Sequence, residues 1–188
     1  MAVVSSGKTT VSSSIWETYS PDLAVDNNFQ TNFYAGSCFS TDVGDMQPYW
    51  YVDLGRDCNI YQVTLTNRGD MQEERMRNIE VDVLTSPPTS MTPTGDFCGT
   101  VTGSVGAGET TPVYCPHTNT TGGFTFPRGR YVRVRKTSME DKYDLLTLCE
   151  VRVVAIFFPT NGHFISSTNE LDLDSHKDRF YGWSGRLF

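Results

Sequence analysis

Three short runs decide the fold class of this chain: YWYVDL at residues 49–54, IYQVTLT at residues 60–66 and IEVDVL at residues 79–84. The last two alternate apolar with polar residues, which is the pattern of a strand with one buried face. Residues 131–135 alternate in the same way, and residues 148–158 are nearly all apolar, as in a buried central strand. Helical periodicity is scarce. We therefore expect an all-β fold, an antiparallel β-sandwich or jelly roll.

The alternation also predicts which charged side chains face solvent. Glu80 and Asp82 alternate with apolar residues in their run, and Arg133 and Arg135 alternate with valines in theirs. We expect the acids to point outward and the two arginines to lie on a solvated strand face, paired with acids. Between these strands, Gly, Pro, Ser and Thr crowd residues 85–111, which we expect to form long loops.

The domain organisation follows from where the strand patterns end. The chain has 188 residues and 38% hydrophobic residues, enough for one ordinary domain with a sizeable core. After residue 158 the sequence becomes polar with scattered aromatic residues. We expect one domain over residues 1–157 and a C-terminal extension of unknown role over residues 158–188.

Charge and composition argue against several function classes. The net charge of −7 disfavours binding to nucleic acid or to an anionic membrane surface. No apolar run approaches the ~20 residues of a spanning helix, and the first ten residues lack the pattern of a signal peptide. The chain has three scattered histidines and no GxSxG motif. We therefore expect neither membrane insertion nor an enzyme.

The cysteines favour an oxidising compartment. None of the five forms the CxxC pair of a structural zinc site, and four of them could form two disulfides with one left over. Cys98 and Cys115 flank a Gly/Thr-rich loop and make a natural local pair, but the sequence leaves the pairing open. Asn119 begins an N-glycosylation sequon. Together these features favour an extracellular protein, the odd cysteine being unassigned. The five are Cys38, Cys58, Cys98, Cys115 and Cys149.

The loop over residues 23–38 is a candidate cation site. Asp26 and Asn28 are separated by one residue, and calcium accepts carboxylate, amide and carbonyl oxygens from such curled loops. The alternative is a turn in which these side chains satisfy backbone donors. On these residues alone, the turn is the favoured interpretation.

A second candidate site lies over residues 67–77. Asp70 could orient Arg68, and Glu73 or Glu74 could orient Arg75. Two fixed guanidinium groups form a rigid donor array, which suits sugar hydroxyls as well as an anion. The alternatives are ordinary surface ion pairs, or an integrin-type Arg-Gly-Asp tripeptide, which is a weak signal.

Read in order, six segments resemble the F-type lectin (fucolectin) family, which has a discoidin-like, galactose-binding-domain-like jelly roll. The resemblance covers about residues 8–157 and is specific only in combination. The matching segments are LAVDNNFQTNFYAGSC at 23–38, PYWYVDLG at 48–55, VTLTNRGDMQEER at 63–75, the Cys98/Cys115 loop, GRYVRVR at 129–135 and LTLCEVRV at 146–153.

The resemblance reverses the interpretation of the first loop, because the family binds calcium there through carbonyl, carboxylate and serine oxygens. The resemblance also implies two disulfides, Cys38–Cys149 and Cys98–Cys115. Carried over by motif, the calcium ligands are the carbonyls of Leu23, Asn28 and Cys149, with Asp26, Ser37 and Glu150.

The resemblance further implies a sugar site with one departure from the family motif. Arg68, Asp70 and Arg75 match the Arg-x-Asp and final basic positions, but the motif histidine is replaced by Ser40 or, with a longer loop, Thr41. Met71-Gln72 replaces a vicinal cysteine pair, and Met71 could keep an apolar contact. Phe33 and Tyr34 match aromatic positions near the pocket.

The family therefore implies a secreted, calcium-stabilised lectin for fucosylated or related glycans, acting in recognition or innate defence. Single monosaccharide sites are weak, so we expect a homo-oligomer that gains avidity. The missing histidine supports an alternative, in which the fold is a degenerate lectin used as a structural or protein-interaction module.

Overall fold

In this computed structural model, the described residues are 1–89, 92–120 and 123–157. They form β-strands joined by loops and three short 3-10 turns, and no α-helix occurs within these ranges. Every strand pair is antiparallel, so the expected all-β antiparallel fold is confirmed. The expected extension, residues 158–188, lies outside the described residues.

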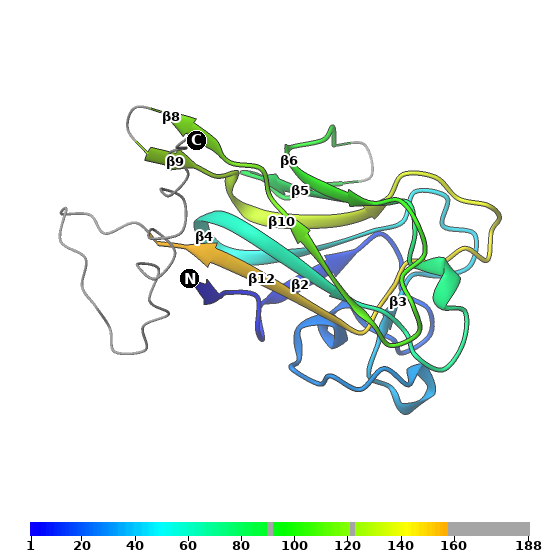
Figure 1. Cartoon of the computed structure of the whole chain (residues 1–188). Helices are drawn as coiled ribbons and strands as arrows, with labels where there is room; N and C mark the ends of the chain where they lie inside the picture. The colour runs from blue at the N-terminus through cyan, green and yellow to red at the C-terminus, as the bar shows by residue number, and fades with distance from the viewer. Residues whose placement is uncertain (90–91, 121–122, 158–188) are drawn as a thin grey trace, which may run out of the picture. The chain divides into compact units, whose positions relative to one another are not determined.

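One long strand organises the sandwich. β4 (Tyr49–Thr66) joins two of the predicted runs into a single strand. Its first half lies between β2 (Thr9–Ser12) and β10 (Arg128–Lys136). Its second half lies between β12 (Glu150–Ile156) and β7 (Thr110–Tyr114). β4 therefore contributes to both layers, as Figure 1 shows.

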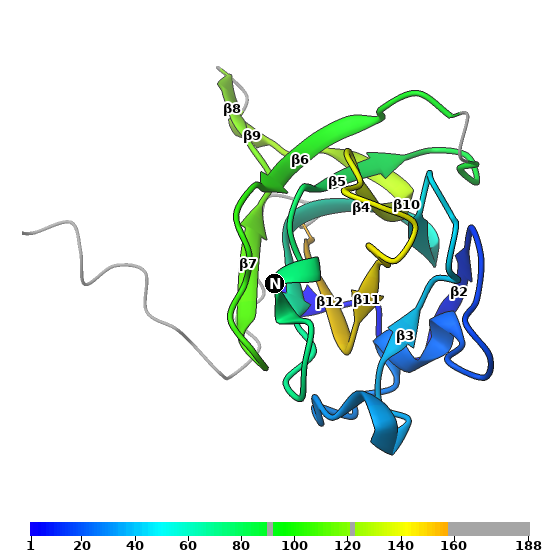
Figure 2. The same cartoon turned by 90° about the vertical axis from the view of Figure 1, so that its right-hand side faces the viewer.

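The remaining strands extend these layers and close one end. β5 (Ile79–Leu84) pairs with β10, and β6 (Asp96–Val101) pairs with β5. β1 (Ala2–Val3) pairs with β12, and β3 (Phe39–Ser40) pairs with β11 (Thr147–Leu148). Two short strands, β8 (Thr118–Thr120) and β9 (Gly123–Thr125), form a separate hairpin. The β3–β11 pair lies at the end of the sandwich that faces the viewer in Figure 2.

Two sequence predictions about strand extent were wrong. Residues 85–111 are not only loops, because β6 and the start of β7 fall within them. The apolar run over residues 148–158 is interrupted at Cys149, since β11 pairs with β3 while β12 pairs with β4. Phe157 follows β12 and is half exposed. The first prediction failed because the Gly, Pro, Ser and Thr content of residues 85–111 masked the strand pattern. The second failed because pairing with distant strands determines where β11 ends and β12 begins.

The prediction that Asp82 and Arg133 face solvent was also wrong. Both side chains are fully buried and form a two-bond ion pair, with Nη2–Oδ2 at 2.6 Å and Nε–Oδ1 at 3.0 Å. The other guanidinium donors of Arg133 bind the carbonyls of Thr89, Thr92 and Pro93. Alternation assigns a residue to one face of the sheet, but whether that face is exposed to solvent depends on the loop that covers it.

The neighbouring Glu80 and Arg135 fit the prediction better. Both remain partly exposed, and they pair with Nη2–Oε1 at 2.6 Å. Earlier in the chain, Val63 and Leu65 are buried as their alternation predicted, whereas Tyr61 on the same face is only partly buried. The core around them is built mainly from β4, β5, β10 and β12.

Both expected disulfides are present. Cys38–Cys149 joins residues 111 apart in sequence, and Cys98–Cys115 joins residues 17 apart. Cys58 is a buried free thiol. The first bridge ties the loop before β3 to the start of β12, and so connects the two candidate sites.

Candidate functional site

A pocket of about 260 Å³ lies where several loops meet at the β3–β11 end of the sandwich. Five of the residues that line it were predicted site residues: Phe33, Tyr34, Ser40, Arg68 and Arg75. They come from the loops before β3, between β4 and β5, and from β3 itself. Segments distant in sequence therefore form one pocket.

Arg68 is fixed by Asp70, as the sequence predicted. Nε donates to Oδ1 and Nη2 donates to Oδ2, both at 2.8 Å, and the guanidinium is buried. Asp70 also accepts a hydrogen bond from the Phe33 N–H at 3.1 Å. The hydrogen bonds from Arg68 hold the pKa of Asp70 below its usual value. Burial lowers the pKa of Arg68, but Asp70 and Tyr34 together outweigh burial, and the pKa of Arg68 is raised.

The apolar side of the pocket is a stack of aromatic rings. Phe33 is buried and stacks on Tyr19, with ring centroids 4.1 Å apart, and on Trp16, at 5.4 Å. The Arg68 guanidinium lies 4.2 Å from the Phe33 ring centroid and 5.2 Å from that of Tyr34. Cation–π contact and the Asp70 fork thus hold Arg68 in one orientation.

Arg75 differs from Arg68 because its guanidinium has no acceptor. The side chain is half buried and lines the pocket, yet no ion pair or side-chain hydrogen bond joins it to the described residues. Burial lowers the pKa of Arg75, and the nearby positive charge of Arg68 adds to the effect. Glu73 and Glu74, which we expected as partners, lie in the same turn without pairing with it. The pocket therefore holds one fixed and one unpartnered cation.

The residues predicted for the motif histidine position lie differently. Ser40 lines the pocket, but its hydroxyl donates to the Thr41 carbonyl at 3.1 Å and lies 3.4 Å from the Thr147 hydroxyl. Thr41 is fully buried, accepts a hydrogen bond from the Leu146 N–H and is not a lining residue. Met71 is 44% exposed and also lies outside the lining.

Besides Gln72, sequence reasoning missed four lining residues that lie outside the arginine motif: Trp16, Val43, Tyr143 and Leu145. They are distant in sequence from the arginine motif and carry no motif of their own. Only the structure distinguishes two of them, since the apolar side chains of Tyr143 and Val43 are about half exposed. Gln72, with a left-handed backbone (φ 58°), completes the lining beside Arg75.

The predicted calcium ligands lie around the start of β12. Leu23, Asp26 and Asn28 belong to the 3-10 turn Pro21–Val25 and the residues after it, and that turn contacts β12. The Asp26 carboxylate accepts the Asn28 N–H at 2.8 Å, as the turn interpretation expects. The Ser37 hydroxyl donates to the Asn32 carbonyl at 2.9 Å. Cys149 is held in its disulfide beside Glu150.

Glu150 is the unusual member of this group. It is buried, and its Oε2 atom has no hydrogen-bond partner among the described residues. Burial, with the negative charge of Asp26, raises the pKa of Glu150 to about 7. An orphaned carboxylate oxygen beside a second carboxylate fits a hard cation such as calcium. Within residues 1–89, 92–120 and 123–157, no three His, Cys, Asp or Glu side chains gather, so carbonyls would supply the other ligands.

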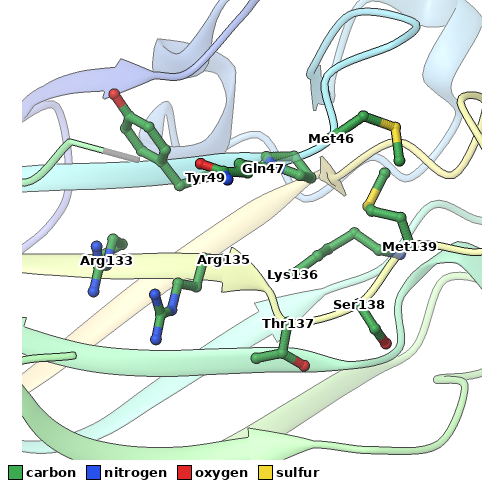
Figure 3. A pocket seen from close by; sticks show the side chains of 10 residues that line it. Met46, Gln47, Tyr49, Arg133, Arg135, Lys136, Thr137, Ser138 and Met139 are labelled. Carbon is green, nitrogen blue, oxygen red and sulfur yellow. The ribbon is translucent and has the colours of Figure 1, made fainter. Parts of the chain in front are cut away.

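A larger cavity of about 470 Å³ lies beside the last residues of β10 and the segment that follows it (Figure 3). Met46 and Met139 lie at one end of it, and Arg133 and Arg135 lie along the strand. Its charged groups are already paired, because Arg133 binds Asp82 and Arg135 binds Glu80. The arginines of this cavity therefore have partners within the protein, unlike Arg75 in the smaller pocket.

Comparison with known proteins identifies the family. A family model described as a NedA-like, galactose-binding domain matches residues 23–134. Fucolectin-6 of Anguilla japonica is 35% identical over 164 residues, which cover 82% of this chain and 75% of that protein. The chain belongs to the fucolectin family. The predicted family membership is therefore confirmed.

Solved structures of fucolectin relatives share the fold. The fucolectin from striped bass (Morone saxatilis) serum matches with a TM-score of 0.68 and 27% identity over 86% of this chain. The match covers 52% of that lectin, so this fucolectin chain spans about half its length. The lectin domain of lectinolysin matches with a TM-score of 0.62 and 26% identity, over 82% of this chain and 96% of that domain. These relatives are lectins, which agrees with the expectation of a protein without catalytic activity.

No helix in the described part of the chain has both the length and the apolar character needed to span a membrane. The sequon at Asn119 includes residue 121, which lies outside the described residues.

Proposed function

We propose that this fucolectin is a calcium-stabilised lectin that binds fucosylated or related glycans in the pocket between Arg68 and Arg75. The observation that carries the proposal is the half-buried Arg75 guanidinium, which faces the pocket without an acceptor. A desolvated cation with unused donors gains most from a ligand that brings oxygen atoms. Sugar hydroxyls supply such oxygens.

The proposed roles follow from the contacts in the pocket. Arg68 and Arg75 donate to sugar hydroxyls, and Asp70 keeps Arg68 in place. The exposed ring of Tyr34 offers an apolar surface to the carbon face or methyl group of the sugar, and the buried Phe33 ring supports it through an edge-to-face contact. Ser40 lines the pocket where the family has a histidine, and its hydroxyl oxygen retains acceptor capacity.

The relatives support this substrate class. The lectin domain of lectinolysin was solved in complex with the Lewis b antigen. Another structural match, 24% identical with a TM-score of 0.63, is a fucose-binding module of Streptococcus pneumoniae. We extend glycan binding to this chain on its own two arginines, because they provide the directional donors that hydroxyls need.

Calcium is proposed to stabilise the loop beside the pocket. Asp26 and Glu150 supply the carboxylates, with Ser37 and the carbonyls of Leu23, Asn28 and Cys149 as further ligands. The cation would neutralise the buried Glu150 carboxylate and join the 3-10 turn to β12. We further propose that the lectin is secreted, forms a homo-oligomer for avidity and serves in recognition or innate defence.

A fucose-rich glycan panel tests the proposal. Binding would be measured with about 1 mM calcium, a concentration typical of extracellular sites, and again with chelator. The Arg68→Ala/Arg75→Ala variant is expected to lose binding while keeping its calcium-dependent melting shift. Wild-type binding to no glycan on the panel would contradict the proposal.

A second candidate function is a structural or protein-interaction module on the same scaffold. The hydrogen bonds of Ser40 within the protein favour this function. Ser40 stands where the family has a histidine, and its hydroxyl is already bonded to Thr41 and Thr147. This alternative predicts no glycan binding and an unchanged calcium response. The panel therefore separates the two functions.

A further inference from the structure

The turn that carries Arg75 is fixed by a buried charged side chain, that of Lys136. In the turn Glu73–Arg75, the Arg75 carbonyl accepts the Lys136 ammonium at 2.6 Å and the Arg77 N–H at 2.9 Å. The Lys136 side chain is fully buried and comes from the end of β10. The backbone of Arg75 is thus fixed while its guanidinium stays unpartnered in the pocket.

A second part of the pocket lining is held by the same network. Lys136 Nζ lies 2.7 Å from Asp144 Oδ1, and Arg77 Nη2 lies 3.2 Å from Asp144 Oδ2. Asp144 is buried and sits between Tyr143 and Leu145, which both line the pocket. One carboxylate therefore links the Tyr143 wall to the Arg75 turn.

The other carbonyls of the turn are held as well. The Asn67 amide donates to the Glu73 carbonyl at 2.9 Å, and the Arg77 guanidinium donates to the Glu74 carbonyl. Both bonds fix the turn to its own loop region. Two ion pairs reach across to the segment over residues 141–145, and both end on Asp144: the shorter comes from Lys136 and the longer from Arg77.

We propose that Lys136 and Asp144 are positioning residues of the sugar pocket, which set the separation between Arg75 and the Tyr143–Leu145 wall. This inference rests on the proposed glycan-binding function for its effect on affinity. The coupling of the two walls is a property of the protein itself and is measurable without a ligand.

Strand β10 provides a matched control. Arg133–Asp82 is an equally buried ion pair three residues before Lys136, but it holds the loop containing Thr89, Thr92 and Pro93. None of these residues lines the pocket around Arg75. The Arg133→Met/Asp82→Asn variant therefore removes a comparable pair without touching the two walls.

The experiment compares Lys136→Met/Asp144→Asn with that control in the full chain. Amide hydrogen exchange is measured over residues 72–77 and 141–145, together with the dissociation constant for the tightest-binding glycan of the panel. In the Lys136→Met/Asp144→Asn variant we expect faster exchange in both segments and at least about tenfold weaker binding. The control is expected to melt at a changed temperature, with unchanged exchange in these segments and affinity within about twofold of wild type.

A conservative variant keeps the test decisive if the double variant does not fold. Lys136→Gln retains a donor for the Arg75 carbonyl, and we expect it to keep more affinity and slower exchange than Lys136→Met. Equal behaviour of these two single variants would overturn the role of Lys136.

The remaining outcomes separate this inference from the proposed function. Unchanged exchange in the Lys136→Met/Asp144→Asn variant, or an equal loss in the control, overturns the coupling of the walls. Faster exchange with unchanged affinity overturns the positioning role. If wild type binds no glycan, the proposed function and the effect on affinity both fail, and the exchange measurement still decides the coupling.

Discussion

The Glu150 carboxylate is buried and the Arg75 guanidinium is half buried, and the two charged sites differ in what each leaves unsatisfied. Near Glu150 a carboxylate oxygen lacks a donor, while in the pocket a guanidinium lacks an acceptor. The Arg133–Asp82 pair is a fully satisfied charged site for comparison, because the Nε and both Nη atoms of Arg133 donate hydrogen bonds to oxygen atoms. The difference indicates that one incomplete site suits a cation and the other a hydroxyl-bearing ligand.

The Cys38–Cys149 disulfide joins these two regions, so breaking it gives the largest expected effect. Cys38→Ala/Cys149→Ala should lose about 4–5 kcal/mol of unfolding free energy on the chain-entropy model, because the bridge closes a loop of over 100 residues. Denaturant titration measures the loss. We also expect both the calcium shift and glycan binding to weaken.

The second disulfide is the control for this prediction. Cys98→Ala/Cys115→Ala opens a loop of only 17 residues and should cost about 3 kcal/mol on the same model. Calcium response and glycan binding should survive. If both variants lost these responses equally, Cys38–Cys149 would have no special connection to the sites.

The raised pKa of Glu150 predicts a pH dependence in the absence of calcium. The carboxyl of unfolded Glu150 ionises near its ordinary pKa of 4.5, whereas in the folded protein the pKa is about 7. The folded state therefore binds more protons in this window, and stability falls as pH rises from 4.5 to 7. The full effect is about 3 kcal/mol at 1.4 kcal/mol per pKa unit.

Glu150→Gln tests the origin of that dependence. In chelator, the variant should show a flatter pH profile of unfolding free energy than wild type, because the titrating carboxyl is gone. It should also lose the stabilisation by calcium. An unchanged pH profile would assign the dependence to other groups.

In the pocket, Arg75→Met should weaken glycan binding by about 1.5–3 kcal/mol, the range for a hydrogen bond to a charged group. Unfolding free energy should stay level or rise, since a half-buried cation without an acceptor is removed. Arg77→Met provides the contrast. Arg77 is paired with Glu140 and Asp144, so its substitution should lower the unfolding free energy. Calorimetric titration and thermal melting measure the two effects.

Tyr34→Ala gives the smallest expected change. The ring is 64% exposed and lies near Arg68, so its loss should cost about 0.5–1 kcal/mol of glycan affinity, a few-fold in dissociation constant. Stability should hardly change. A loss as large as that of Arg75→Met would place the ring at the centre of recognition instead.

Local patterns predicted well where the interacting residues are close in sequence. Arg68 and Asp70 are two residues apart, and their pairing followed from that spacing. The strand alternation placed Val63 and Leu65 in the core. The resemblance to fucolectins supplied the Cys38–Cys149 bridge, which the sequence pattern alone had left open.

Predictions failed where a distant segment decides the environment. Asp82 and Arg133 are buried because the loop around Thr92 covers them, which alternation cannot report. Trp16 and Tyr143 join the pocket through contacts between remote segments, and nothing beside them in sequence indicated a site. Which loop covers a strand, and which distant segments meet in a pocket, depend on the tertiary fold and not on local periodicity.

Thermal melting with two ligands tests the contrast between the two sites most directly. Wild type, Glu150→Gln and Arg75→Met would be melted with calcium or chelator, each with and without fucose. The expected result is that Glu150→Gln loses the calcium shift and Arg75→Met loses the fucose shift while keeping the calcium shift. A wild type that responds to neither ligand, or a fucose shift that survives in Arg75→Met, would contradict the assignment of the two incomplete sites.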